Sequence, residues 1–431
     1  METVFFPLFY IIHLGFSLVI PEYNCVSLLL LGHITFDPRI SLGLNFSLNH
    51  VHFAILFIHL ILIFRNKGMA SAVNYVPILT FLPLLIWMGI NAIFWSDHLH
   101  YGWIKYTGSV VGVFISYFLV LRYRLLGITS IYRFLFLLFG AVAIYTSAGF
   151  LNLILYHQTD RLVTWGGGTL SLARYAGYCI ILGCAVYSFF QQWKLRAPVI
   201  LLIGISLVTL INTASKGPVL FLWLVSGIAL WLIWDTPPTW KKWSYWIGAG
   251  LVIVILIWIA EVEGRFLVNP FTEVDPNGSY QSRLTFWSRS LALIKDFPLV
   301  GIGWGDFVDY GVIGTITHGY PHNILFEIGA ETGIVGILMF VIIIIPIGKF
   351  WQLGKIRTSN SAAEQIIIYS CLILALYTFL NLLVSYNFAS SRFLWVFLTL
   401  TGLVNHRFYH HSLIKVSTAH AGDSNIPGIA K

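Results

Sequence analysis

A histidine stands at the start of a long apolar segment in the last third of the chain. Pro321 directly precedes His322 and Asn323, and proline is favoured at the first position of a helix. We therefore expect His322 and Asn323 in the first turn of a helix. The positive end of the helix dipole disfavours a charged imidazole, so His322 could act as a general base. An ordinary histidine at a membrane interface is the alternative interpretation.

Two carboxylates occur within the same apolar segment. Glu327 and Glu331 are four residues apart, so they share one face of the expected helix. An ionisable residue inside a membrane segment is a functional candidate by default. Glu331 could equally be a structural partner for a cation on the same side of the membrane. His318 and Tyr320, just before the histidine, are supporting candidates.

Six cations lie near the ends of apolar segments or in the polar stretch before the histidine. They are Arg161, Arg174, Lys216, Arg283, Arg289 and Arg392. Each one alone could be a snorkelling side chain or half of an ion pair. Together on one side of a membrane they would suit an anionic ligand, most naturally a phosphate or pyrophosphate at the lipid surface.

An arginine and a tryptophan in the polar stretch are spaced to share a helix face. Arg283 and Trp287 are four residues apart, and a guanidinium can stack on an indole ring. Trp287 and Tyr320 could also stack on a sugar. Aromatic residues of this kind are equally typical of the interfacial belt of a membrane protein.

The composition indicates what kind of protein must position these side chains. Of the 431 residues, 58% are hydrophobic and 10% are charged, and the mean hydropathy is +0.82. These values exclude a soluble enzyme, a disordered protein and a disulfide scaffold. Apolar stretches of about 20 residues recur from end to end, which predicts an all-α polytopic membrane protein. The net charge of +8 indicates membrane orientation and not a nucleic-acid surface.

Neither metal nor nucleotide chemistry is indicated. The four cysteines lie in apolar segments without the spacing of metal ligands, and the histidines are scattered. No glycine-rich phosphate loop is followed by Lys and Ser or Thr. We therefore expect no cofactor, and the energy for a reaction must come with the substrate.

We expect about twelve transmembrane helices and one long loop between the ninth and the tenth. The expected spans are 4–20 (or up to 32), 48–64, 76–94, 103–121, 134–156, 170–190, 198–213, 217–234, 243–262, 322–348, 365–384 and 388–405. The organisation is then helices 1–9 over 1–262, an external loop over 263–321, helices 10–12 over 322–405 and a cytoplasmic tail over 406–431. Within the loop we expect a helix over 282–295 and a glycine-rich turn over 301–305.

The distribution of basic residues sets the orientation. Most Lys and Arg residues lie in one set of short loops and in the tail, and this set is expected to face the cytoplasm. The long loop and the six cations named above then lie outside. Glu2, where a signal peptide would carry a basic residue, argues against a cleaved signal. The spans show neither an inverted repeat nor a Gly or Pro break at mid-membrane depth.

These residues resemble the O-antigen ligase and polymerase superfamily of bacterial membrane glycosyltransferases. The most specific match is His322-Asn323, nine residues, and then Gly333-x-x-Gly336. The stretch 296–307 is similar to a family pattern with Asp, Pro and two Gly residues followed by Phe. The similarity covers about residues 160–400.

Further positions resemble the family, and one departs from it. The similar positions are Ser282-Arg283 with Trp287, Arg161, and the run from Ser391 to Trp395. Members usually show Ser-Arg-Gly in the turn between the two central spans. This chain has Ser215-Lys216-Gly217 there, which keeps the positive charge and loses the bidentate guanidinium.

The resemblance implies a GT-C-like fold and a reaction on the external, periplasmic face of the bacterial inner membrane. The donor would be a glycan on undecaprenyl pyrophosphate, whose pyrophosphate would be held by Arg283, Arg161, Lys216 and Arg392. His322 would take the proton from an acceptor hydroxyl, which attacks the anomeric carbon. The supporting residues would be Asn323, Glu331, Glu327, Trp287, Arg289, Tyr320, His318 and Arg174.

We interpret the chain as an O-antigen or polysaccharide polymerase, whose acceptor is another lipid-linked repeat unit. The closer resemblance is to polysaccharide polymerases, and it lies in the sequence Tyr-Pro-His-Asn-Ile with its Phe-Glu-Ile continuation. Lys216 in place of the usual arginine also favours a polymerase over a ligase. An O-antigen ligase, with lipid A–core as the acceptor, is the alternative. A lipid-linked sugar transporter or flippase is a further one, for which inverted repeats and broken helices are expected. The expected partners are the donor, the acceptor glycan, membrane lipid and a chain-length regulator, without nucleic acid.

Overall fold

The computed structural model describes the larger part of the chain. The described residues are 13–31, 48–67, 81–156, 162, 168–213, 215–233, 279–313, 316–317, 320–348, 362–385 and 388–403. Of the expected features, the span 243–262, the tail 406–431, Arg161 and His318 lie outside the described residues.

The regular structure of the described part is helical apart from one small hairpin. The helices are α2 (Pro21–Leu31), α3 (Leu48–Lys67), α5 (Leu82–Phe94), α6 (Leu99–Leu126), α7 (Ile128–Tyr156), α8 (Thr169–Phe189), α9 (Trp193–Asn212), α10 (Lys216–Ile233), α12 (Ser279–Asp296), α13 (Phe307–Tyr310), α14 (Ile324–Gly348), α16 (Ala362–Leu382), the 3-10 turn η3 (Phe388–Ser391) and a helix over Arg392–Leu403. The hairpin pairs β1 (Val312–Ile313) with β2 (Ile316–Thr317) in antiparallel fashion. The sequence did not predict this hairpin.

Six described helices are long and apolar enough to cross a membrane. They are Leu99–Leu126, Ile128–Leu155, Thr169–Phe189, Trp193–Asn212, Ile324–Ile345 and Glu364–Leu382. Shorter apolar helices cover Val51–Ile63, Leu82–Phe94, Lys216–Leu230 and Arg392–Leu403. The helical membrane class expected from the sequence is thus confirmed. The total of twelve spans and the external position of the long loop stay predictions.

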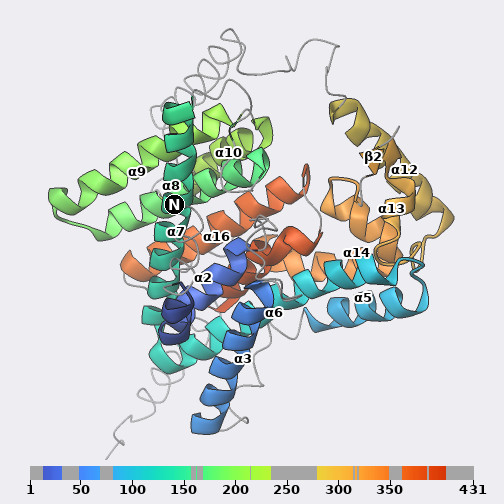
Figure 1. The fold of residues 1–431 in the computed structure, drawn as a ribbon, viewed down its shortest axis with the longest axis horizontal. Coiled ribbons are helices and arrows are strands. Elements are labelled where there is room, and N and C mark those ends of the chain that lie inside the picture. The colour runs from blue at the N-terminus through green and yellow to red at the C-terminus, as the bar shows by residue number, and fades with distance from the viewer. Residues whose placement is uncertain are drawn as a thin grey trace, which may run out of the picture.

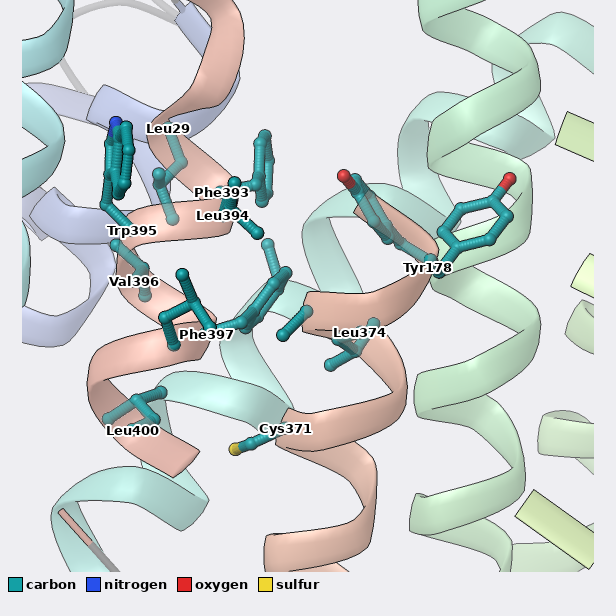
Figure 2. Packing of buried hydrophobic residues seen from close by; sticks show 14 of the residues in the cluster. Leu29, Tyr178, Cys371, Leu374, Phe393, Leu394, Trp395, Val396, Phe397 and Leu400 are labelled. Atoms are coloured by element: carbon teal, nitrogen blue, oxygen red, sulfur yellow. The ribbon is translucent and has the colours of Figure 1, made fainter. Parts of the chain in front are cut away.

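Aromatic side chains fill the centre of the bundle where α8, α16 and the last described helix meet. Figure 2 shows Tyr178 of α8 facing Phe393 and Phe397 of the last helix, with ring centroids 4.9 and 6.0 Å apart. The neighbouring Gly177 lets α16 approach, because a Cβ at that position would overlap the ring of Tyr377. Large aromatic rings therefore pack in the core against small residues such as Gly177, which leave room for them.

The N-terminal part of the described chain forms two helical pieces. Residues 13–19 are helical, Ile20 is not, and α2 follows as a separate helix. Helix α2 packs against α3 and α7, and its Glu22 forms an ion pair with Arg122 of α6. The break therefore falls at the Pro21 boundary that divides the first apolar run.

Helix α14 is broken inside the membrane-spanning segment. Gly333 adopts φ 69° and ψ −167°, and the amide of Ile334 donates to the carbonyl of Pro298 instead of continuing the helical ladder. Our expectation of spans without a glycine break is wrong here, because a backbone segment from outside the helix inserts at this point. Residues 324–332 consequently form a short helix of their own, which we call the front segment of α14.

The long polar stretch packs beside this front segment. In Figure 1, α12 and α13 lie next to α14 and well away from α9 and α10, and the contacts between helices agree. The expected helix over 282–295 is confirmed by α12, and the expected turn at 301–305 is confirmed by irregular backbone there.

Candidate functional site

His322 lies before the first turn of α14 and not inside it. The helix begins at Ile324, and Asn323 precedes it as the capping residue. Asn323 Oδ1 accepts hydrogen bonds from the amides of Leu325 and Phe326 at 2.9 and 3.2 Å. The expectation that both residues lie in the first turn is therefore wrong. The first amides of a helix have no partner within the helix, and the side chain of an asparagine just before the helix can accept their hydrogen bonds.

The backbone of His322 is in the left-handed region, with φ of 57°. It is the one non-glycine residue with a positive φ in the described part of the chain. Such a conformation costs energy in most side chains and persists only where the surroundings hold it. Strain of this kind concentrates at functional sites, so the geometry supports a role for the imidazole.

Aromatic residues of α12 and of the preceding loop hold the histidine. The imidazole is half-buried, with its centroid 4.5 Å from that of Tyr320 and 6.2 Å from that of Phe286. Trp287 Nε1 donates to the carbonyl of Pro321 at 3.1 Å. Arg283 is four residues before Trp287 on α12 and is half-buried. Helix α12 thus brings Trp287 to the histidine loop, and Arg283 lies one turn earlier on the same helix.

A lysine that the sequence analysis did not single out lies at the centre of the front segment. The Nζ of Lys105 in α6 is 2.6 Å from Glu327 Oε1 and donates to Glu331 Oε2 at 2.6 Å. The side chains are 1%, 0% and 0% exposed respectively. The open alternative for Glu331, a structural partner of a cation, is thus what the structure shows. A lysine inside an apolar stretch was the available signal.

Each of the two carboxylates also accepts a backbone amide from a different loop. Glu327 Oε2 accepts from the amide of Phe388 at 2.8 Å, and Glu331 Oε1 accepts from that of Phe307 at 3.3 Å. The ring of Trp304 lies 4.5 Å from Lys105 Nζ and adds a cation–π contact. The cluster of Lys105, Glu327 and Glu331, which we call the buried lysine cluster, therefore joins α6, α14 and two loops.

The glycine-rich turn packs backbone against backbone. Gly301, Gly303 and Gly305 all have positive φ, and a Cβ at Gly301 would overlap the backbone of Glu331. The amide of Ile302 donates to the carbonyl of Ala330 at 3.0 Å, which helps to cap the front segment at its far end. The glycines of this motif are explained by close approach and need no ligand.

Three of the expected cations bind backbone carbonyls. Arg174 Nη2 donates to Asn381 and Ser385 at the end of α16, at 3.1 Å each. Arg392 Nη1 donates to Leu28 of α2 at 3.1 Å. Arg289 Nη1 donates at 2.7 Å to the carbonyls of Tyr310 and Val312, beside the hairpin. Positive charge at a helix C-terminus is favourable, so Arg174 and Arg392 also stabilise the helix ends that they contact.

The end of α16 gathers several of the expected residues. Asn323 Nδ2 donates to the carbonyl of Leu383 at 2.7 Å, close to the carbonyls that bind Arg174. Lys216 is half-buried at the start of α10, and the adjacent Gly217 lies so close to α16 that a Cβ there would sit 3.3 Å from Val384. The histidine loop, Arg174 and the Lys216 turn thus meet at one end of α16.

The described residues contain no group of three His, Cys, Asp or Glu side chains arranged to hold a metal ion. The chemistry available at this end of the bundle comes from the half-buried imidazole of His322 and from Arg174 and Lys216, which lie at the same end of α16. Such a set can accept a proton and bind an anion.

A comparison with protein families identifies part of this region. Residues 199–341 match the family model described as O-antigen ligase, and this region contains the Lys216 turn, α12, the glycine-rich turn and the front segment of α14. The comparison with curated proteins returned no match. This match supports the resemblance read from the His322-Asn323 motif: residues 199–341 are similar to the O-antigen ligase and polymerase superfamily, whose members are membrane glycosyltransferase-like enzymes acting on lipid-linked glycans.

Proposed function

We propose that the chain is an O-antigen or polysaccharide polymerase on the external face of the bacterial inner membrane. The donor is a glycan carried on undecaprenyl pyrophosphate, and the acceptor is a second lipid-linked repeat unit. The observation that carries this proposal is the strained, half-buried His322 at the start of α14, beside the Arg283–Trp287 face of α12. Neither a metal nor a nucleotide takes part.

The reaction follows from the residues around the histidine. His322 accepts the proton of an acceptor hydroxyl, and the oxygen attacks the anomeric carbon of the donor sugar. The bond from that carbon to the pyrophosphate oxygen breaks, and undecaprenyl pyrophosphate leaves. Arg283, Arg161, Lys216 and Arg392 bind the pyrophosphate and stabilise the charge that develops on it. Of the supporting residues, Trp287 and Tyr320 offer ring faces for a sugar.

The ligase alternative differs only in the acceptor, the sugar of lipid A–core. The matched family model is described as O-antigen ligase, and the family covers ligases and polymerases, so the match is compatible with both. Lys216 in place of the family arginine favours a polymerase, because a lysine binds phosphate as a point charge without the bidentate fork. A flippase would gain support from the break at Gly333, but the carbonyls of Ala330 and Glu331 at the end of the front segment accept the loop amides of Ile302 and Gly303, so a loop holds this end in place.

Reconstitution with defined substrates tests the proposal. Purified protein in proteoliposomes receives the lipid-linked repeat unit alone, or the same donor with lipid A–core. Polymer from the donor alone supports the polymerase. Product that forms only with lipid A–core contradicts it in favour of the ligase, and movement of the donor across the bilayer without product indicates a flippase.

A histidine variant tests the role of the base. We expect His322→Ala to lower polymer formation by about 10²- to 10⁴-fold, the usual contribution of a general base. His59→Ala is the matched control, because His59 of α3 is also half-buried but bonds only the carbonyl of Ser17 in the N-terminal helix. Wild-type chain lengths from a well-inserted His322→Ala protein would refute the assigned role.

A further inference from the structure

The front segment of α14 is a short helix that is separated from the rest of α14. It begins at the Asn323 cap and ends at the break at Gly333. Near its far end, the carbonyls of Ala330 and Thr332 accept from the amide of Ile302 and the indole of Trp87. A helix of this length has little stability of its own, so its position is set by what holds it from the side.

The buried lysine cluster provides that lateral hold. Glu327 and Glu331 lie on successive turns of the front segment, about 6 Å apart along its axis. The compact ammonium group of Lys105 has three donors and reaches both carboxylates. One side chain of α6 therefore fixes both the position of the front segment along its axis and its rotation about that axis.

Each carboxylate also transmits this position to a loop of the site. Glu327 accepts the amide of Phe388, four residues before Arg392. Glu331 accepts the amide of Phe307, which follows the glycine-rich turn. Burying three charges is costly, and replacing such a set by apolar residues is often harmless to stability. Stability alone therefore does not explain the cluster, and a role in fixing the positions of the front segment and the two loops does.

We infer that Lys105 is a positioning residue, which acts through Glu327 and Glu331 to fix His322 relative to the turn that carries Arg392. The inference rests on the proposed function, because that function assigns the roles of His322 and Arg392. Lys105 itself touches no substrate. Its loss lets the front segment shift, and a displacement of about 1 Å at reacting groups lowers turnover by about 100-fold.

Kinetics with a matched control test the inference. We expect Lys105→Met to lower kcat for polymer formation by about 100-fold while KM for the donor stays near the wild-type value. Arg122→Met removes a different ion pair, the one with Glu22, from the same helix, and its kcat should stay near that of the wild type. A rise in KM instead of a fall in kcat, or equal losses in both variants, would overturn the inference.

Two further variants keep the test valid if Lys105→Met folds poorly. Glu331→Met and Glu327→Met each leave Lys105 paired with the other carboxylate, so no buried charge is left without a counterion. In amide hydrogen exchange, Glu331→Met should speed exchange at Phe307 and not at Phe388. Glu327→Met should do the reverse. Unchanged exchange at both amides would overturn the inference.

The exchange measurement also separates this inference from the proposed function. If the wild-type protein makes no polymer, the polymerase proposal fails, and exchange at Phe307 and Phe388 still reports whether the cluster holds the two loops. If polymer forms and exchange is unchanged in the variants, the polymerase proposal stands and the positioning role is rejected.

Discussion

The two ends of α6 carry the same kind of interaction with different surroundings. Near its start, Lys105 is 1% exposed and serves two carboxylates at 2.6 Å each. Near its end, Arg122 is 18% exposed and its Nε lies 2.9 Å from the single carboxylate of Glu22. The buried lysine cluster has one carboxylate more than it has cations, whereas the Arg122–Glu22 pair is balanced.

The two ends differ in the burial of the cation, since Lys105 is buried and Arg122 is partly exposed. The Arg122 pair joins two helices, α2 and α6, and the chain then turns directly into α7. The Lys105 end is covered by the glycine-rich turn and by the front segment of α14. Lys105 and both of its carboxylates are buried where loops close over this end of the bundle, whereas at the other end Glu22 is buried and Arg122 stays partly exposed.

The largest expected effect comes from two glycines with the same backbone conformation. Gly333 has φ 69° and ψ −167°, and Gly127, just after α6, has φ 65° and ψ −152°. Both lie in a region that only glycine adopts readily, at a cost of about 1–3 kcal/mol for another residue. A Cβ at Gly333 would also overlap the backbone of Leu299, while nothing lies within 4 Å of one at Gly127.

We therefore expect Gly333→Ala to destabilise the protein by more than about 4 kcal/mol, and Gly127→Ala by the strain alone, about 1–3 kcal/mol. Thermal unfolding in detergent measures the difference. Equal midpoints for the two variants would show that the Lys105 end is no more tightly packed than the other.

The next effect compares the two ion-paired cations themselves. Lys105→Met leaves two buried carboxylates without their cation, and we expect a loss of about 3–5 kcal/mol in unfolding free energy. Arg122→Met leaves one buried carboxylate, that of Glu22, beside a position that is 18% exposed, so the loss should be smaller than for two buried carboxylates. Lys105→Arg, which keeps the charge, should recover part of the stability. An Arg122→Met loss as large as that of Lys105→Met would remove the contrast between the two ends.

The smallest effect concerns the helix caps. Asn323 caps α14 through its side chain, whereas Gln192, the N-cap of α9 at the start of another span, makes no such bond. We expect Asn323→Ala to cost about 1 kcal/mol and Gln192→Ala to change stability little. Denaturant or thermal unfolding of the two variants checks this. A silent Asn323→Ala variant would mean that the tertiary contacts alone hold the start of α14.

Much of the fold follows from local patterns. The apolar run predicted a span over 134–156, and α7 covers Ile128–Tyr156. The polar helix predicted over 282–295 corresponds to α12. These predictions succeed because hydropathy and helix periodicity act over neighbouring residues.

The local predictions failed where distant segments meet. His322 was expected inside the first turn of α14, and the Asn323 cap, which also bonds Leu383, moved it outside. The glycine break in α14 was not expected, since it depends on the backbone of residues 298–300 inserting beside Gly333. Neither contact leaves a periodic signal in the sequence.

The sequence by itself determined the membrane class, the superfamily resemblance and the histidine motif, since composition and short motifs are properties of adjacent residues. Only the tertiary structure paired Lys105 with Glu331, which is 226 positions away. It also assigned Arg174, Arg289 and Arg392 to backbone carbonyls. A buried charge must find a partner wherever the fold supplies one, and hydropathy along the chain cannot say which partner that is.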